Sequence, residues 1–469
     1  MFNRINCILK TGVITTLCLL VLSPAYADQK VLIEKIGKLE GQFKSLSAAF
    51  YKDYSRADKK NLETTPNIDQ LLININKLDD SNQSVKAIQL IYFNKQVIND
   101  NLDTKAVFSF VELLLDNNEW KLANHLFKEI ESEGDKSLLS PVRFIFAKYH
   151  AQRHEWKQVI KQLEGIFPDL SEENAAYAYL LNGTALQHIK KHRLAVESYN
   201  KIPTSSKYYN FAQLNTAIAN IRQGWWTDAQ SKIKSLLKIS NKTNKDELTN
   251  RLYLILGYAL LQREYYRDAR DAFRHIGLSS RYTNRALLGI GLTATSQGDY
   301  IGGLNALTIL KDKKTFDLSV DESYLLVPYV YEKLQQELTV SNSYTEAMNY
   351  FQRRMSQLDQ IASKHHDIKN LKYNSETMNI NIQNNSFDFG RFYPESFLNN
   401  FNQLHEFKRI SKSSKIKKRI SKLISQYDVT YQKVISDLAA QRKSYLKSYL
   451  NQSRYGLARL YDSSKETSN

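Results

Sequence analysis

Small residues recur along most of this chain at nearly constant intervals, and this spacing restricts the possible folds more than any other feature of the sequence. In the stretch Arg251–Phe273, Ala269 follows Gly257 by twelve residues and Tyr266 by three, and it precedes Phe273 by four. Related patterns place equivalent residues at Ala87, Ala123, Val159, Ala195, Ala229, Ala269, Gly303 and Ala347. Their steps are 36, 36, 36, 34, 40, 34 and 44 residues. A period in this range predicts an array of repeated units.

The composition and the position of the small residues indicate that each unit is a pair of helices. The 469 residues include only 16 glycines and 7 prolines, which favours helices joined by short turns. Gly257 would lie on a first helix and Ala269 on a second, and small side chains there let the two backbones approach closely. Since neither helix can bury its apolar face alone, the units must stack. The sequence therefore predicts an all-α fold of helical hairpins.

This regular series of small residues, called the ladder below, resembles the tetratricopeptide repeat family, whose unit is a helix–turn–helix of 34 residues. The resemblance covers roughly residues 67–353 and implies a superhelical solenoid of about seven or eight units over residues 66–355. The 36-residue steps indicate turns about two residues longer than is usual in the family. The 44-residue step indicates an insertion around Lys311–Ser323.

The resemblance also implies that the first helices of the units line an inner groove that binds peptides. The candidate peptide-contacting residues there are Phe211, Asn215, Ile218, Arg222, Arg251, Tyr258 and Arg285. This mixture suits a peptide with acidic and apolar side chains. Alternatively, Ile218 and Tyr258 pack between neighbouring units. The Lys and Asn that grip a C-terminal carboxylate in some family members are replaced by Leu and Ile or Tyr, so that clamp is not expected.

The first 27 residues have the pattern of a secretory signal peptide. Arg4 and Lys10 precede a short apolar run, and Ala25 and Ala27 frame the cleavage position. The alternative is an uncleaved N-terminal anchor. Cleavage would remove Cys7 and Cys18, the only two cysteines, and would exclude disulfides and thiol chemistry from the mature chain. We expect a protein exported to the periplasm of a Gram-negative bacterium.

The mature chain would keep a net charge of about +15, because the signal carries two of the basic residues and none of the acidic ones that give +17. In an exported protein this charge points to lipid phosphates, lipopolysaccharide or acidic protein faces as partners, and nucleic acid is not expected. Alternatively, the charge only aids solubility.

The segments that flank the repeats have their own patterns. Within residues 28–65, the apolar residues Leu32, Ile36, Leu39, Phe43, Leu46 and Phe50 follow heptad spacing. They predict an amphipathic helix that self-associates or folds back on the next helix. Residues 356–392 are polar and are expected to form a linker, and residues 393–469 a helical, coiled-coil extension. The layout of a heptad segment before exported repeats is similar to the cell-division coordinator family that works with the Tol–Pal system, which has no counterpart of this extension.

A run of basic residues in the extension is a second candidate site. The run has an apolar side, provided by Ile410, Ile416, Ile420 and Leu423, and no acidic residue between Lys408 and Lys422. Such a helix suits an anionic membrane surface, although an ordinary helix with a solvated face has the same pattern. The candidate residues are Lys408, Arg409, Lys415, Lys417, Lys418, Arg419 and Lys422.

No catalytic motif supports an enzymatic reading of the chain. There is no phosphate-binding glycine loop, GxSxG elbow or HExxH motif. His150 and His154 are four residues apart, as are His188 and His192, but neither pair has a third ligand nearby. We therefore expect no metal, no cofactor and no catalytic site. The sequence favours a non-enzymatic scaffold that binds envelope proteins or peptides, with an anionic-surface binder as the alternative.

Overall fold

The computed structural model describes residues 24–57, 65–81, 83–133, 136–240, 247–314, 316–367, 372–374 and 378–466. The signal peptide predicted for residues 1–27 lies almost wholly outside these ranges and stays a prediction. Among the described residues, no helix has both the length and the apolar character needed to cross a membrane.

Eight helical hairpins follow one another along the described chain. They are α3 (Ile68–Asp80) with α4 (Ser84–Phe93), α6 (Lys105–Asp116) with α7 (Trp120–Glu133), α8 (Lys136–Ala151) with α9 (Trp156–Leu163), α10 (Glu172–His188) with α11 (His192–Tyr199), α12 (Tyr209–Gln223) with α13 (Trp226–Ser240), α14 (Glu247–Gln262) with α15 (Tyr266–Arg274), α16 (Thr283–Ser296) with α17 (Tyr300–Lys311), and α18 (Leu318–Lys333) with α19 (Glu337–Ser363). The short helix α5 (Lys95–Asn99) follows α4, and the 3-10 turn η2 (Phe167–Asp169) follows α9.

The small residues lie where the ladder predicted them. Each of the eight positions falls on the second helix of a hairpin, and every one of them is buried. Gly257 and Gly291 lie on first helices; a methyl group added to Gly257 would come within 2.5 Å of the Phe273 ring, and one added to Gly291 within 2.6 Å of Leu307. These contacts confirm the predicted all-α fold of close-packed hairpins.

In seven of the hairpins, the first helix ends at a residue in the left-handed backbone conformation, with positive φ. Gly224 and Gly298 fill this position in two of them, and the others have Asn118, His154, Lys190, Glu264 and Gln335, with φ between 56° and 81° in every case. The N–H of the following residue donates to a carbonyl five residues earlier, as in the bond from Lys191 to Leu186 of 2.8 Å. This bond caps the helix and turns the chain sharply.

The described chain divides into two compact units, each built from separate stretches of sequence. Among the described residues, one contains those of 32–219 and 390–431, and the other contains those of 220–389 and 432–466 together with residues 24–31. The long helix α21 (Ser414–Glu466) contributes to both. Here the first is called the 32–219 unit and the second the 220–389 unit.

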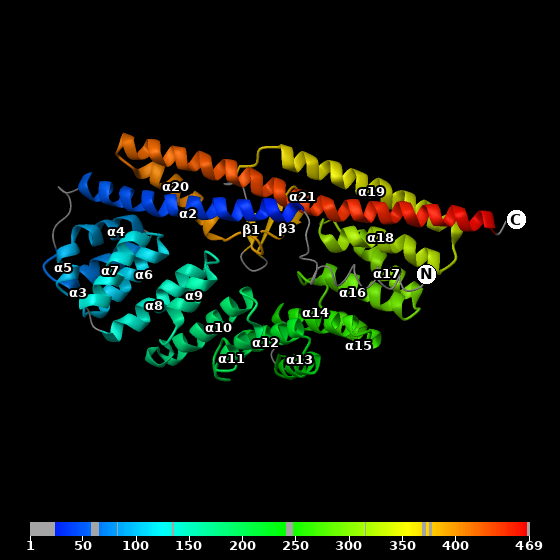
Figure 1. The fold of residues 1–469 in the computed structure, drawn as a ribbon, viewed down its shortest axis with the longest axis horizontal. Coiled ribbons are helices and arrows are strands. Elements are labelled where there is room, and N and C mark those ends of the chain that lie inside the picture. Colours follow the sequence, from blue (N-terminus) through cyan, green and yellow to red (C-terminus); the bar gives the residue numbers. More distant parts are fainter. Residues whose placement is uncertain are drawn as a thin grey trace. The chain divides into compact units, whose positions relative to one another are not determined.

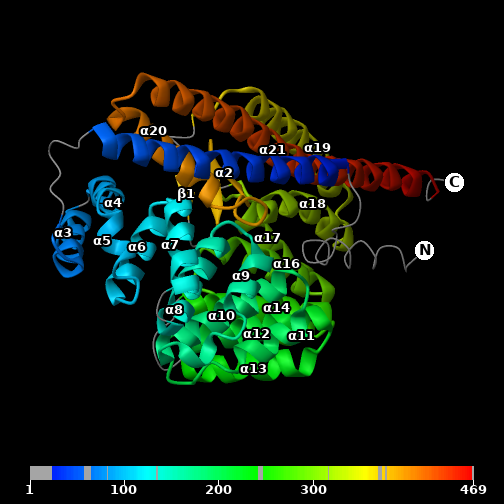
Figure 2. The same cartoon turned by 60° about the vertical axis from the view of Figure 1, so that its left-hand side comes forward.

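In the 32–219 unit, the N-terminal helix α2 (Pro24–Ala57) packs beside α20 (Ser396–Ile410), as Figures 1 and 2 show. The Phe407 ring stacks on Phe50 at 4.2 Å and on Phe43 at 6.3 Å between centroids. All six residues of the predicted heptad seam are buried. The seam thus folds against a helix from the far end of the chain, which neither expected arrangement anticipated.

In the 220–389 unit, a small sheet occupies the segment that the sequence indicated to be a polar linker. The strands β1 (Lys372–Asn374), β2 (Asn379–Ile382) and β3 (Asn385–Phe387) pair antiparallel in chain order. Ile380 and Phe387, which face each other across the register, are buried. The linker prediction is therefore wrong here, and α19 also continues into it as far as Ser363.

The predicted insertion near Lys311–Ser323 supplies a partner for this sheet. Phe316 lies in the loop between α17 and α18, where its N–H donates to the Asn384 carbonyl and its own carbonyl accepts from the Ser386 N–H, both at 3.2 Å. The Arg354 side chain of α19 donates to Asn385 Oδ1 at 2.5 Å. The residues inserted between α17 and α18, together with Arg354, thus hold the strands against the last hairpin.

Candidate protein-binding face

The first candidate residues share one side of the helix α12. Phe211, Asn215, Ile218 and Arg222 are spaced by four, three and four residues, which places them along one face. Phe211 is 49% exposed and Arg222 is also exposed, whereas Asn215 and Ile218 are half-buried. The Asn215 backbone carbonyl accepts a hydrogen bond of 2.8 Å from Gln187 of the preceding hairpin.

The second group lies on α14 and α16 in the 220–389 unit. The Tyr258 hydroxyl donates to the Arg285 backbone carbonyl at 2.9 Å, and the Arg285 guanidinium lies 5.6 Å from the centre of the tyrosine ring. Burial raises the pKa of Tyr258 to about 12, although Arg285 opposes this effect. Tyr258 is half-buried because it joins neighbouring hairpins, which is the packing role that the sequence left open.

Exposed arginines flank this tyrosine. Arg251 lies two turns before Tyr258 on α14, and both Arg251 and Arg285 are exposed. Neither guanidinium forms an ion pair within the described residues. The tyrosine hydrogen bond fixes the spacing of the two helices that carry the arginines. This arrangement can bind carboxylates next to an aromatic surface.

The same face is closed at the next first helix, α18, by the chain's own C-terminal helix. Arg442 of α21 donates to Asp321 of α18 at 2.7 Å, and Arg459 pairs with Glu332 at the other end of α18. Asp321 also lies 3.7 Å from Arg354 and accepts a hydrogen bond from Tyr350 at 2.7 Å. Within the 220–389 unit, the candidate side chains that stay open to a partner include those of α14 and α16.

Beside this ion pair lies Glu322, a carboxyl group that the sequence did not single out. It is 7% exposed, and no described side chain forms a hydrogen bond or ion pair with it. Burial raises its pKa to about 8. Its charge in turn raises the pKa of Tyr258 and of Tyr449, so it lies near the candidate face.

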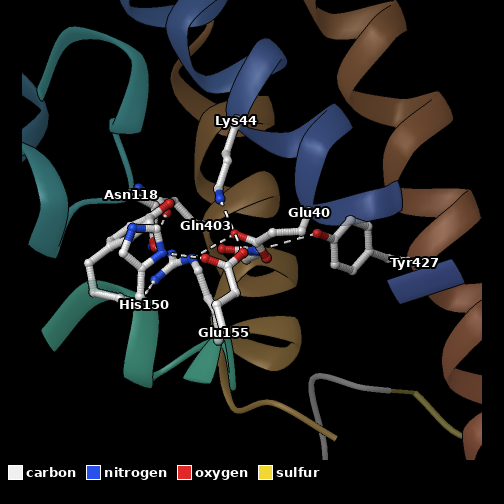
Figure 3. Close-up of polar contacts among 10 residues, drawn as sticks. Glu40, Lys44, Asn118, His150, Glu155, Gln403 and Tyr427 are labelled. Atoms are coloured by element: carbon white, nitrogen blue, oxygen red, sulfur yellow. Dashed lines mark hydrogen bonds and ion pairs between the residues drawn. The ribbon is translucent and has the colours of Figure 1, made fainter. Parts of the chain in front are cut away.

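A buried polar network joins α2, α20 and α21 to the hairpins of the 32–219 unit (Figure 3). Arg153, in the turn between α8 and α9, donates to Glu40 Oε1 at 2.8 Å and to the Tyr149 carbonyl at 3.0 Å, and it also bonds Asn118. Asn400 of α20 donates to the other Glu40 oxygen at 2.5 Å. The Arg153 and Glu40 side chains are 2% and 8% exposed.

Two further links complete this network. Gln403 donates to the Asn117 carbonyl at 2.6 Å and accepts from Asn118 at 2.9 Å, and Lys44 lies 3.6 Å from Glu155. Burial alone would raise the pKa of Glu155, but its contacts with His150 and Lys44 lower it. Because the groups are enclosed and bonded to one another, the network anchors the flanking helices. Sequence reasoning missed it because its members are far apart in the chain.

The paired histidines pack against other side chains. The Trp156 ring stacks on His188 at 4.0 Å and on His154 at 5.1 Å, and His150 is bonded to Glu155. Among the described residues, no group of three or more His, Cys, Asp or Glu is placed to hold a metal ion.

The basic candidates of the extension lie in the 32–219 unit, at the end of α20 and the start of α21. Lys408, Arg409, Lys415, Lys417, Lys418, Arg419 and Lys422 are all exposed. The apolar side of the run is turned inward, since Ile416, Ile420 and Leu423 are at most 6% exposed. This packing agrees with the alternative of an ordinary helix whose charged face is solvated, because the apolar residues pack α21 within the protein.

The paired helices cross at small residues in one hairpin after another, and most first helices end in a residue with positive φ. These two features identify the type of repeat. The repeat region is a tetratricopeptide-type array. The described part of the chain contributes eight hairpins to this array.

Solved tetratricopeptide-type structures resemble this array. The C-terminal part of a TPR repeat-containing protein from Cytophaga hutchinsonii is 14% identical, covers 52% of this chain and 94% of its own, and has a TM-score of 0.44. The apo form of RapI is 13% identical over 76% of this chain and 97% of its own, with a TM-score of 0.45. YrrB, a TPR protein with an unusual peptide-binding site, is 14% identical over 46% and 97%, with a TM-score of 0.33.

At these identities and TM-scores, the likeness carries no information about what the array binds. No protein-family model matches the sequence, and no curated protein matches it.

Proposed function

We propose that the protein is a non-enzymatic scaffold that binds an acidic segment of an envelope protein across α14 and α16. The observation that carries the proposal is the pair of exposed arginines, Arg251 and Arg285, on either side of Tyr258. Their guanidinium groups have no carboxylate partner within the described residues, and the helices that carry them are held rigidly. A carboxylate bound there would gain two charge-assisted bonds with little ordering cost.

The location proposed for this scaffold is the periplasm. Support comes from the sequence of residues 1–27, where a positive start, a short apolar run and a small-residue cleavage position follow one another. N-terminal sequencing of the protein recovered from a periplasmic fraction tests it. A mature N-terminus at Asp28 is expected, and a protein that keeps Met1 and stays with the membrane would contradict cleavage.

Crosslinking of the intact chain in an envelope extract tests the binding face. With Arg251→Glu and Arg285→Glu combined, we expect crosslinks from α14 and α16 to a partner to fall at least tenfold. The matched control combines Arg263→Glu and Arg267→Glu, which reverse two exposed charges near the turn of the same hairpin. Equal crosslinking by both double variants would refute the role of this face.

A second candidate function rests on the seven basic candidate residues between Lys408 and Lys422, which are all exposed and do not include Lys412. None of them forms an ion pair within the described residues, so their charge is available to an anionic surface. Co-sedimentation with vesicles that contain phosphatidylglycerol tests this function. Binding should decrease with salt and should be lost when Lys417 and Lys418 are both changed to Glu. Binding that is equal on neutral vesicles would exclude the electrostatic mechanism.

A further inference from the structure

A basic cavity lies between the N-terminal helix and the first two hairpins of the 32–219 unit. Its volume is about 670 Å³, and its walls come from α2, the end of α4, the start of α5, and α7. Along α2, the wall is formed by Ser45, Ala48, Ala49 and Lys52, which share one helix face. Small side chains at the first three positions leave the space open.

The cavity concentrates positive charge. Lys52, Arg56, Lys95 and Lys121 line it, and no aspartate or glutamate does. Lys52, Arg56 and Lys121 are exposed and have no ion-pair partner among the described residues. The fifth basic group, His125, lies 3.5 Å from Glu129 on its own helix.

The surroundings of Lys95 show that the positive charge in the cavity lacks a counter-charge. Burial lowers the pKa of Lys95, and the nearby charge of Lys52 lowers it further, whereas Glu119 opposes both effects. Glu119 is itself buried, and it is bonded to Tyr92 at 2.8 Å and to the Leu122 N–H at 3.1 Å, so it does not reach into the cavity. An anion bound in the cavity would supply the missing counter-charge.

The apolar part of the lining narrows the chemistry of the occupant. Ala48, Ala49, Phe93 and Leu122 line the cavity together with the cations, so the space accepts an apolar side chain as well as negative groups. A free phosphate would leave these apolar atoms uncovered. A space lined by three separate parts of the chain suits a protein segment better than the plane of a bilayer surface.

From these observations we propose that this cavity is a docking site for a segment of a partner protein in which carboxylates flank an apolar side chain. The site is separate from the face of α14 and α16, and it needs no residue of that face. Charge complementarity sets the class of segment, and the small residues of α2 set the room for its apolar side chain.

Fluorescence anisotropy on the mature chain, residues 28–469, tests the proposal. The probe is a labelled nine-residue peptide of alternating Glu and Leu, and the control peptide has Gln in place of Glu. We expect the Glu peptide to bind at least tenfold more tightly and its affinity to fall between 50 and 200 mM salt, roughly as ion-pair contacts require. Equal binding of the two peptides would overturn the proposal.

Variants locate the site. Lys52→Glu combined with Lys121→Glu should weaken binding at least tenfold, whereas Lys38→Glu with Lys128→Glu, two exposed lysines outside the cavity, should leave it within twofold. Ala48→Trp should also weaken binding, because it fills the cavity without changing its charge. Circular dichroism melting confirms that each variant is folded.

Two other outcomes would contradict the site. If Arg251→Glu with Arg285→Glu abolished peptide binding and the cavity variants did not, the peptide would bind only the α14 and α16 face. If phosphatidylglycerol vesicles bound in a Lys52- and Lys121-dependent manner while the peptide did not bind, the cavity cations would serve a membrane surface instead.

Discussion

Phe273 shows how single residues hold neighbouring hairpins together. Its ring is fully buried between Gly257 of α14 and Gly289 of α16, and a methyl group added to either glycine would lie within 2.5 Å of the ring. The ring therefore sets the separation of two first helices from a position on the second helix between them.

Replacing one of these glycines should destabilise the 220–389 unit. We expect Gly289→Ala to lower the free energy of unfolding by about 1–3 kcal/mol, because the ring must shift in a packed core. Gly277→Ala is the matched control, since an added methyl group there meets nothing within 4 Å. Urea denaturation measures both variants, and a Gly289→Ala variant as stable as Gly277→Ala would contradict the close approach.

Glu322 should make stability depend on pH in an unusual direction. Its folded-state pKa of about 8 lies above the value of about 4.3 for an unfolded glutamate, so the folded state holds the proton more tightly. The contribution of this group is fully present below about pH 4 and is lost as the pH rises through 8. Its size should be on the order of a few kcal/mol.

Unfolding free energies of the wild type and of Glu322→Gln, measured from pH 5 to pH 9, give this contribution as a difference. The variant should gain stability relative to the wild type as the pH rises. Glu131→Gln, at an exposed position on α7, is the control and should follow the wild type. A difference that is constant with pH would show that Glu322 titrates normally.

At the scale of elements, the non-glycine residues with positive φ that end the first helices lower the stability of the fold, and glycine at these positions would remove this strain. Lys190 closes α10 with φ of 65°, which is unfavourable for a residue with a side chain. Lys190→Gly should raise the free energy of unfolding by about 0.5–1 kcal/mol. Lys191→Gly, one residue later at φ of −89°, should lower it, and thermal melting of the two variants gives the comparison. The reverse order would contradict the capping role.

The Arg153 network should decide whether α2 and α20 stay docked. Arg153→Met leaves Glu40 buried without its ionic partner, and we expect a loss of about 3–5 kcal/mol with faster hydrogen exchange in both helices. Adding Glu40→Leu should recover part of the loss, because a buried ion pair is replaceable by apolar groups. Lys148→Met removes a more exposed pair and serves as the control. Unchanged exchange in Arg153→Met would exclude the anchoring role.

The elements differ in how well the sequence predicts them. The hairpins were predictable because each needs a small residue at a fixed helical position, as at Ala195 and Ala269. The sheet was not, since its strands are three or four residues long and asparagines separate their few apolar residues. The heptad seams predicted amphipathic helices, but an apolar seam does not specify its partner. For the same reason, the cavity lined by Lys52 and Lys121 depends on contacts that no local pattern encodes.

At the scale of the whole molecule, each unit is completed by residues from the last fifth of the chain. Deleting residues 390–469 removes α20 and the helix α21. We expect the truncated chain to expose the α2 seam, to bind more of a hydrophobic dye and to melt at a lower temperature. A peptide of residues 390–431, added in trans, should reverse part of this change. A truncated chain that melts like the complete protein would show that α2 is held by the hairpins alone.

Glu40 and Asn400 are 360 residues apart, yet they share a buried hydrogen bond. A ribosome that adds about 5–20 residues per second needs on the order of tens of seconds to make the second residue after the first. During that interval, the rings of Phe43 and Phe50 lack the phenylalanine on which they later stack. The helix α2 therefore completes its packing only after α20 has been made, and any delay late in biosynthesis prolongs the exposure of its aromatic side chains.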